Sequence, residues 1–137
     1  MKQKVVAFPQ PEQTEAVFYE AFMHGDVNVI AAIWSADNAV CVHPGSSIIQ
    51  GHEAVIRSWQ HILDHALSPD IDYKVLNKTQ TESLAVHVVE EKIKTAQTQP
   101  AVVISTNVYH KNSEGWQMLQ HHSSLVQRQE EKNQTLQ

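Results

Sequence analysis

The sequence predicts an α+β domain, with helices in its first half and an antiparallel sheet in its second half. Residues 12–66 carry apolar side chains at the spacings of amphipathic helices, interrupted by a short strand pattern. From residue 71 onward the apolar period changes to two, which is typical of half-buried strands. Helices that precede a run of strands indicate an α+β arrangement rather than alternating α/β units.

The first half contains three expected helices and one expected hairpin. The helices are predicted over residues 12–24, 27–34 and 52–66, with Gly25 ending the first and Asp26 capping the second. Residues 39–43 and 48–50 alternate like strands on either side of the turn Pro44–Ser47. This places His43 at the last strand position, directly before the turn.

The second half is predicted to be a four-stranded meander over residues 71–78, 84–95, 102–111 and 116–127, with a tight turn at Asn112–Gly115. A curved sheet with helices across its concave face leaves a space between the two layers. Such a space is the usual position of a ligand pocket.

The chain is expected to form one domain over residues 12–127, because 137 residues fit a single core of ordinary size. Residues 1–11 are predicted to be an irregular arm, since Pro9 and Pro11 stop an early helix. The polar residues 128–137 are expected to be a C-terminal tail.

Composition excludes several classes of partner. The formal net charge of −5 argues against nucleic acid or an anionic membrane, both of which need a basic face. No apolar run approaches the roughly 18 residues of a membrane span. The apolar run near the start is too short for a signal peptide, and the single Cys41 forms no internal disulfide. We therefore expect a cytoplasmic chain with a small-molecule ligand.

Two stretches of the chain resemble a known family. Residues 18–59 read FYEAFMHGDVNVIAAIWSADNAVCVHPGSSIIQGHEAVIRSW, and residues 105–124 read STNVYHKNSEGWQMLQHHSS. Both are similar to nuclear-transport-factor-two-like domains, in particular SnoaL-like and ketosteroid-isomerase-like proteins, and the resemblance covers about residues 12–126. The features that carry it are the Gly25–Asp26 helix end, Trp34 before an acidic turn and a strand, the His43–Gly45 turn, Gly51–Ala54 leading to Trp59, and the closing hairpin.

The resemblance implies a cone-shaped, cystatin-like roll. In such a roll a curved mixed or antiparallel sheet and three N-terminal helical segments enclose a deep pocket. The family usually forms homodimers, and we expect the second copy to cover the outer face of the sheet. The apolar residues expected on or near that face are Val86, Val88, Val102, Ile104 and Val108.

The resemblance also implies roles for individual residues. In ketosteroid isomerases the general base is a carboxylate at the end of the first strand, just before a proline, and His43 before Pro44 matches it. The acid that stabilises the enolate matches Asn107. The helix-one tyrosine matches Phe18, with Tyr19 expected on a different face, so the oxyanion tyrosine is expected to be missing.

The chemistry of His43 and Asn107 leaves alternatives open. An imidazole acts as a base near neutral pH without a large pKa shift, but a histidine at a strand end can also be purely structural. The amide of Asn107 can hold a developing oxyanion, or it can fix loop or water structure.

His121 and His122 are neighbours on the last predicted strand, so their side chains point to opposite faces. The resemblance places the Trp116 face inside the cone, which would put Gln120, His122 and Ser124 in the pocket and His121 against the dimer partner. A register shift of one residue would exchange these roles.

The remaining candidates are tryptophans and histidines. Trp34 and Trp59 are expected in the core, where their rings can also form pocket walls. His61 and His65 have the helical spacing of a zinc clamp, but a solvated helix face is the simpler interpretation. His43, His122 and Glu90 would share an ion only if three strands converged. We expect neither metal nor cofactor.

Two functions fit these observations. The first is an isomerase, cyclase or dehydratase in which His43 moves a proton on an apolar ligand with a carbonyl or hydroxyl group. Asn107, together with His122, would stabilise the resulting negative charge. The second is a non-catalytic ligand-binding or dimerisation module.

Overall fold

The computed structural model describes residues 6–66, 68–96 and 99–127. Every expected helix and strand is present, with ends within two residues of the prediction. The expected tail and residues 1–5 of the expected arm lie outside the described residues; residues 6–10 are non-helical, as expected, and Pro11 already belongs to the first helix. The elements are α1 (Pro11–His24), α2 (Val27–Ile33), β1 (Val40–Val42), β2 (Ile49–Gln50), α3 (His52–His65), β3 (Asp70–Gln80), β4 (Leu84–Lys94), β5 (Ala101–Asn112) and β6 (Gly115–Leu125).

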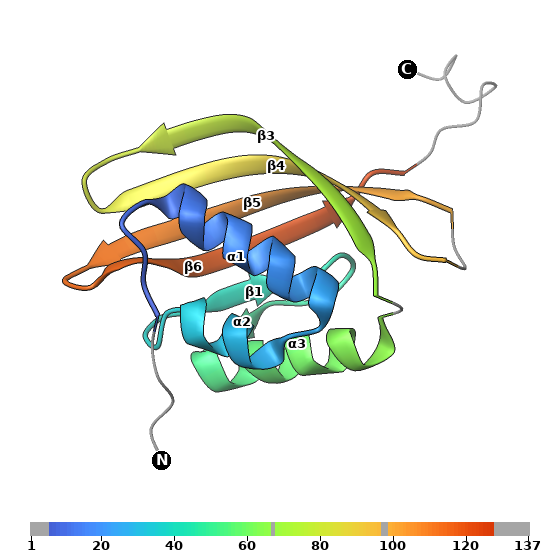
Figure 1. The fold of residues 1–137 in the computed structure, drawn as a ribbon, viewed down its shortest axis with the longest axis horizontal. Coiled ribbons are helices and arrows are strands. Elements are labelled where there is room, and N and C mark those ends of the chain that lie inside the picture. The colour runs from blue at the N-terminus through green and yellow to red at the C-terminus, as the bar shows by residue number, and fades with distance from the viewer. Residues whose placement is uncertain (1–5, 67, 97–98, 128–137) are drawn as a thin grey trace.

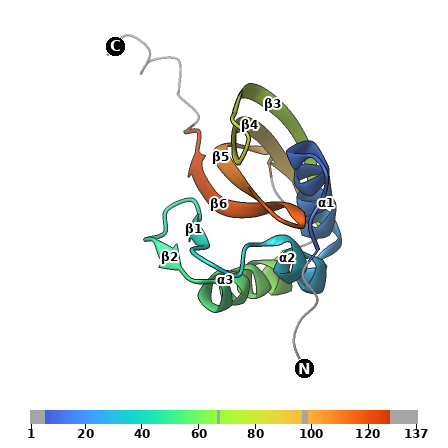
Figure 2. The same ribbon diagram turned by 90° about the vertical axis from the view of Figure 1, so that its left-hand side faces the viewer.

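All six strands belong to one mixed sheet in the order β2-β1-β6-β5-β4-β3. The short strand β1 runs parallel to β6, and every other neighbouring pair is antiparallel. The hairpin of the first half is therefore an extension of the meander of the second half. The long strands curve strongly around the face that α1 covers, as Figure 2 shows.

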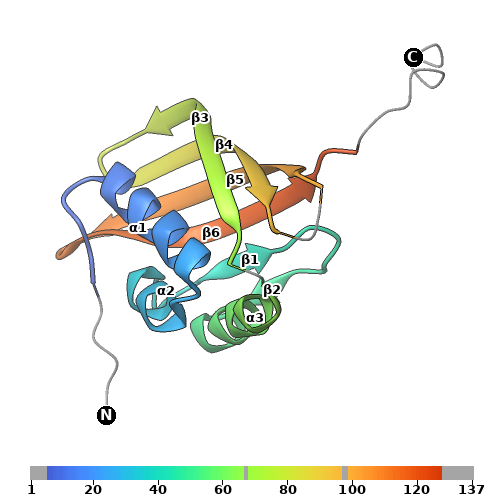
Figure 3. The ribbon, with the colours of Figure 1, turned by 45° about the vertical axis from the view of Figure 1, so that its right-hand side comes forward.

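Helix α1 crosses the concave face of the sheet, while α2 and α3 lie below it beside β1 and β2 (Figure 1). Figure 3 shows α3 nearly end-on, next to this short hairpin. The interior between these layers is filled mainly by aromatic and aliphatic side chains. The largest fully buried ones include Trp34, Trp59, Tyr19, Tyr109 and Phe18.

The start and end of α1 follow from local chemistry. Pro11 occupies the first turn, where its missing N–H is not needed. The Gln10 N–H donates to Gln13 Oε1 at 3.0 Å, and the Gln13 N–H donates to the Gln10 carbonyl at 3.1 Å. Gly25 ends the helix with φ 69°, a left-handed conformation that glycine adopts without strain, and Asp26 then accepts a bond from Val29 N to begin α2.

A β-bulge in β6 decides which histidine faces the interior. Tyr109 of β5 pairs with Met118, but the next residue, Val108, pairs with Gln120, so Leu119 is an extra residue in β6. The inward face therefore changes from the even-numbered Met118 to the odd-numbered His121.

This bulge makes the expected inward face of β6 wrong beyond Leu119. His121 and Ser123 are buried, at 3% and 4% exposure. Gln120, His122 and Ser124 are exposed instead. His121 consequently faces the interior of the cone, not the outer face where a dimer partner was expected.

The convex face of the sheet carries a half-buried apolar surface in its middle strands. Its members are Val86, Val88, Val102, Ile104 and Val108, which alternate with the inward residues of β4 and β5. We call these five residues the outer valine face. No helix in residues 6–66, 68–96 or 99–127 is both long and apolar enough to cross a bilayer.

Candidate functional site

His43 lies directly after β1, at the start of a tight turn. Its backbone N–H donates to Ser46 Oγ at 2.9 Å, and the Ser46 N–H donates back to the His43 carbonyl at 2.9 Å. Its half-buried ring packs edge-on against Trp59, with ring centroids 4.8 Å apart. Strand, turn and indole together hold the imidazole in one orientation.

The hydrogen bonds of His43 define its tautomer. Ser58 Oγ donates its only proton to the Val55 carbonyl at 2.6 Å, and His43 Nε2 lies 2.9 Å from the same Oγ. The proton between them must therefore belong to Nε2. Burial lowers the pKa of His43, so the ring is neutral near neutral pH and Nδ1 keeps its lone pair. Among the described residues, Nδ1 has the buried Cys41 Sγ as its polar neighbour, at 3.8 Å.

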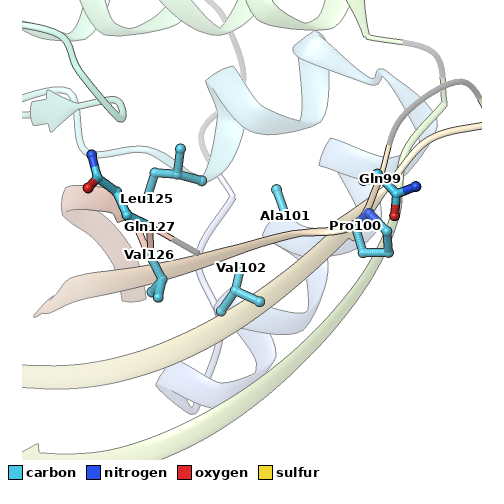
Figure 4. A pocket seen from close by; sticks show the side chains of 7 residues that line it. All are labelled: Gln99, Pro100, Ala101, Val102, Leu125, Val126 and Gln127. Atoms are coloured by element: carbon cyan, nitrogen blue, oxygen red, sulfur yellow. The ribbon is translucent and has the colours of Figure 1, made fainter. Parts of the chain in front are cut away.

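His43 is one of the residues that line an open depression of about 490 Å³ at the ends of β1 and β6, which we call the mouth depression. The turn 42–46 forms one side of this mouth depression, and residues 122–125 form the other. A second depression, of about 570 Å³, lies between residues 99–102 and 125–127 (Figure 4). The two share Leu125 and Gln127.

The deep pocket implied by the resemblance is occupied by side chains. Phe18 packs against Trp59 at 5.2 Å and against His121 at 5.3 Å between ring centroids, and Phe22 packs against Trp59 at 5.1 Å. Phe18, Trp34 and Trp59 are at most 1% exposed. These side chains belong to the core, whereas the mouth depression lies at the ends of β1 and β6.

Below the mouth depression, polar side chains form a buried hydrogen-bonded series. Ser123 lines the depression, and its Oγ lies 2.7 Å from His121 Nε2 and 2.7 Å from Ser105 Oγ. His121 Nδ1 lies 2.6 Å from Asn107 Oδ1. Burial, together with the nearby His43 and His122 rings, lowers the pKa of His121 to about 3, so this imidazole is neutral.

The series continues from Asn107 to a buried carboxyl group. Asn107 Nδ2 donates to the Tyr19 hydroxyl at 3.0 Å, and that hydroxyl donates to Glu91 Oε2 at 2.5 Å. Glu91 is 1% exposed, and burial raises its pKa. Burial and the carboxyl of Glu91 raise the pKa of Tyr19 strongly, so Tyr19 remains a phenol.

A second buried carboxyl group lies beside this series. Glu15 accepts hydrogen bonds from the Tyr109 hydroxyl at 2.7 Å and from His87 Nδ1 at 2.9 Å. Burial and the Glu15 charge raise the pKa of Tyr109 well above its usual value. Both glutamates thus lie within hydrogen-bonded tyrosine environments on the concave face.

The structure brings some of the expected site residues together and separates others. His43 and His122 both line the mouth depression, although His122 reaches it from the exposed side of β6. Asn107 is inside, but its amide nitrogen and oxygen are already bonded to protein partners. Its amide oxygen and one of its two N–H groups are therefore engaged with protein partners.

The sequence reasoning missed Tyr19, Glu91 and Glu15. Tyr19 was expected on a different face from Phe18, but both are fully buried, and the Tyr19 hydroxyl contacts Asn107. A helix tyrosine is therefore present, one position later than the matched residue. Strict alternation from the buried Ala85 along β4 is a signal that would have placed Glu91 inside.

Within the described residues, no group of three or more His, Cys, Asp or Glu side chains is arranged to hold a metal ion. His61 and His65 lie on the exposed face of α3 with their ring centroids 4.5 Å apart.

Solved structures similar to this one extend over nearly the whole chain. A protein from Thiobacillus denitrificans, provisionally described as a calcium/calmodulin-dependent protein kinase type II association domain, is 29% identical with a TM-score of 0.84; the match covers 89% of this chain and 99% of that chain. A protein from Streptomyces avermitilis, provisionally described as a dehydratase of the NTF2-like family, is 26% identical with a TM-score of 0.79, covering 85% and 94%.

A ketosteroid isomerase-like protein from Erwinia carotovora atroseptica shares the fold at 18% identity, with a TM-score of 0.70 and coverage of 86% and 95%. Other neighbours are described as having a cystatin-like fold. A comparison with curated proteins found no match. The model of the SnoaL-like domain matches residues 12–128. Since this match includes both the helices and the sheet that hold His43, the chain belongs to the SnoaL-like family.

Proposed function

We propose that the chain binds a small, largely apolar organic molecule in the mouth depression and that His43 removes a proton from it. The observation that carries this proposal is the neutral imidazole whose Nδ1 lone pair is left unprotonated by the Ser58 and Val55 bonds. A neutral imidazole next to a hollow is a competent general base near neutral pH.

The reaction class follows from the groups around His43. Proton removal next to a carbonyl group produces an enolate, which is the shared intermediate of isomerisation and of dehydration by β-elimination. His122 lines the same depression and supplies an N–H donor for the developing negative charge. Asn107 acts indirectly, because its amide holds His121 in place instead of contacting the ligand.

The neighbours support this reaction class without identifying a substrate. One 26%-identical neighbour is described provisionally as a dehydratase, and a more distant one as ketosteroid isomerase-like. No Lys or Arg lines the mouth depression within the described residues, which favours a ligand without a carboxylate or phosphate group.

The test is proton exchange in heavy water. Cyclohexanone and related simple ketones are incubated with the protein in D2O, and loss of the proton signal next to the carbonyl is followed by NMR. His43→Gln should slow the catalysed exchange by about 100-fold or more, the usual contribution of a general base. His61→Gln, on the exposed face of α3, is the matched control and should leave exchange unchanged. Equal exchange rates for the wild-type and His43→Gln proteins would contradict the proposal.

A second function, a non-catalytic association module, is favoured by a separate observation. The outer valine face leaves five aliphatic side chains only half-buried on the convex side of the sheet. We propose that a second copy of the chain covers this face to form a homodimer. The 29%-identical neighbour described provisionally as an association domain supports this alternative. A dimer with no exchange activity would favour association over catalysis.

A further inference from the structure

We infer that the mouth depression takes a short, uncharged, apolar peptide in extended conformation, which pairs with the end of β6 as an added strand. The observation that carries this inference is the free edge of β6 at Ser123 and Leu125, directly beyond the end of its pairing with β1. This class of ligand deepens the proposed function and rests on it only for the choice of hollow.

The edge of β6 that faces away from β5 is covered by other segments along most of its length. Phe8 and Trp34 form single bridges to the first half of the strand. β1 then pairs with residues 120–122, where this ladder ends. β6 itself continues to Leu125. Within the described part of the chain, no strand or bridge partner covers residues 123–125 on this side.

The main-chain groups that face this opening follow from the alternation along the strand. The N–H of Val126 donates to the Val102 carbonyl at 2.8 Å, so the main chain of Val126 faces β5. Since successive residues of a strand direct their N–H and C=O groups to opposite sides, those of Ser123 and Leu125 face the side of β1. The mouth depression lies on that side, because the turn 42–46 after β1 forms its other wall.

Pro44 explains why β1 leaves these groups free. Because the odd-numbered residues of β6 face β1, the even-numbered residues of β1 bond it. The N–H of His43 accordingly points the other way and donates to Ser46 Oγ at 2.9 Å. The next even-numbered residue is Pro44, which has no N–H to donate to the Ser123 carbonyl. The Ser46 N–H then donates to the His43 carbonyl at 2.9 Å, and the chain turns away from β6.

The free groups of β6 match one residue of an extended chain. In parallel pairing, a single residue of the added strand donates its N–H to the Ser123 carbonyl and accepts at its C=O from the Leu125 N–H. The hollow of about 490 Å³ provides room for such a segment. A ligand that satisfies both groups therefore carries a donor and an acceptor in the order of a peptide main chain.

This opening lacks the protection that the long free edge of the sheet carries. That edge is β3, which bears charged residues such as Asp72, Lys74 and Lys78 and has an extra residue, Leu76, that interrupts its ladder. Charges and bulges of this kind keep other chains from pairing with an edge. Residues 122–127 contain no Asp, Glu, Lys or Arg. The end of β6 is thus open to an uncharged chain.

Apolar side chains beside the opening favour an apolar peptide. Leu125 and Val126 are 55% and 47% exposed. Leu125 also lines the second depression, together with Pro100, Ala101 and Val102. Aliphatic side chains of a bound peptide would remove this surface from water, which is favourable.

The pairing is tested with the capped peptide acetyl-Val-Leu-Val-amide and NMR of the nitrogen-15-labelled protein. Titration should move the amide proton of Leu125 downfield, because it gains a hydrogen bond. Two matched probes replace one peptide N–H by an ester oxygen, either at the leucine or at the following valine. Since alternate residues of a strand face opposite sides, one ester should bind about fivefold more weakly than the peptide and the other equally well. No shift at Leu125, or the same affinity for both esters, would overturn the inference.

Two protein variants test the other side of the pairing. Leu125→Pro removes the N–H that faces the opening, and proline is tolerated at a strand edge where no N–H is needed. Leu125→Ala is the matched control, because it loses the same side chain but keeps the N–H. Amide shifts at Ser123 should show the peptide bound about fivefold more weakly by the proline variant than by the alanine variant. Equal affinities would overturn the role of this N–H. The ester probes use the unsubstituted protein, so their result does not depend on the folding of either variant.

The two proposals fail in distinguishable ways. If ketone exchange is absent while the peptide pairs at Leu125, the catalytic role of His43 is wrong and the peptide edge stands. If His43-dependent exchange is present without the peptide shift, the proposed function stands and the peptide class of ligand is wrong.

Discussion

Removing the hydroxyl group of Tyr19 should destabilise the fold more than its small size suggests. The hydroxyl accepts from Asn107 at 3.0 Å and donates to Glu91 at 2.5 Å, and the residue is fully buried. Tyr19→Phe keeps the aromatic ring, so it opens almost no cavity. It leaves two buried polar groups without a partner, at about 1–3 kcal/mol each. We expect a loss of about 2–4 kcal/mol in the free energy of unfolding.

The assay is urea denaturation at several fixed protein concentrations, because association would add to the apparent stability. Tyr73→Phe is the matched control. Its ring stacks on Tyr19 at 4.2 Å between centroids, but its hydroxyl has no recorded hydrogen-bond partner among the described residues, and the residue is half-buried. That variant should change stability by less than about 0.5 kcal/mol. If both variants lost the same small amount, the buried hydrogen-bonded series from Ser123 to Glu91 would contribute little to the fold.

Three further outcomes are expected. Burial raises the pKa of Glu91, so above pH 4.5 the unfolded chain releases this proton while the folded chain still holds it. The contribution of Glu91 to the free energy of unfolding is therefore complete below that pH. It falls by about 1.4 kcal/mol per pH unit until the pKa of the folded chain is reached. Glu91→Gln should lack this fall, as pH-dependent denaturation curves will show, and parallel curves would contradict it. Ile104→Lys in the outer valine face should convert a dimer to a monomer, measured as molecular mass by light scattering. Ile48→Lys, exposed outside that face, should leave the mass unchanged. Cys41 is fully buried, and burial raises the pKa of its thiol to about 12. A disulfide reagent should therefore label it about 100-fold more slowly in the native protein than in urea. Fast labelling of the native protein would show that β1 opens readily.

The order of the elements could be predicted because local residues mark their limits. Gly25 and Asp26 separate the first two helices, and the turn after His43 separates β1 from β2. The change of apolar period near residue 71 marks the beginning of the meander. These signals act within a few residues of the boundary that they set, so a single sequence contains them.

The pairing of β1 with β6 and the filled interior could not be predicted in the same way. Val40 pairs with Gln120 across most of the chain, and only the folded geometry brings them together. Apolar periodicity predicts which side chains face inward but not the volume that they leave. Here Phe18 and Trp59 fill the space where the resemblance implied a deep pocket.

The candidate site was partly predicted for a related reason. His43 was found because a strand end, a turn and a matched family position coincide at one residue. Tyr19 and Glu91 were missed because their importance arises from contacts between distant elements, 72 residues apart in sequence. That mutual hydrogen bond has no local signature.

The extra residue at Leu119 also affects how relatives of this chain should be compared. Two homologues can both carry a His-His pair in the same alignment column, yet expose opposite members of the pair if only one has the insertion. Transferring a functional role by column number would then assign it to a surface side chain. Equivalence between family members along this strand is better established from backbone pairing than from residue count.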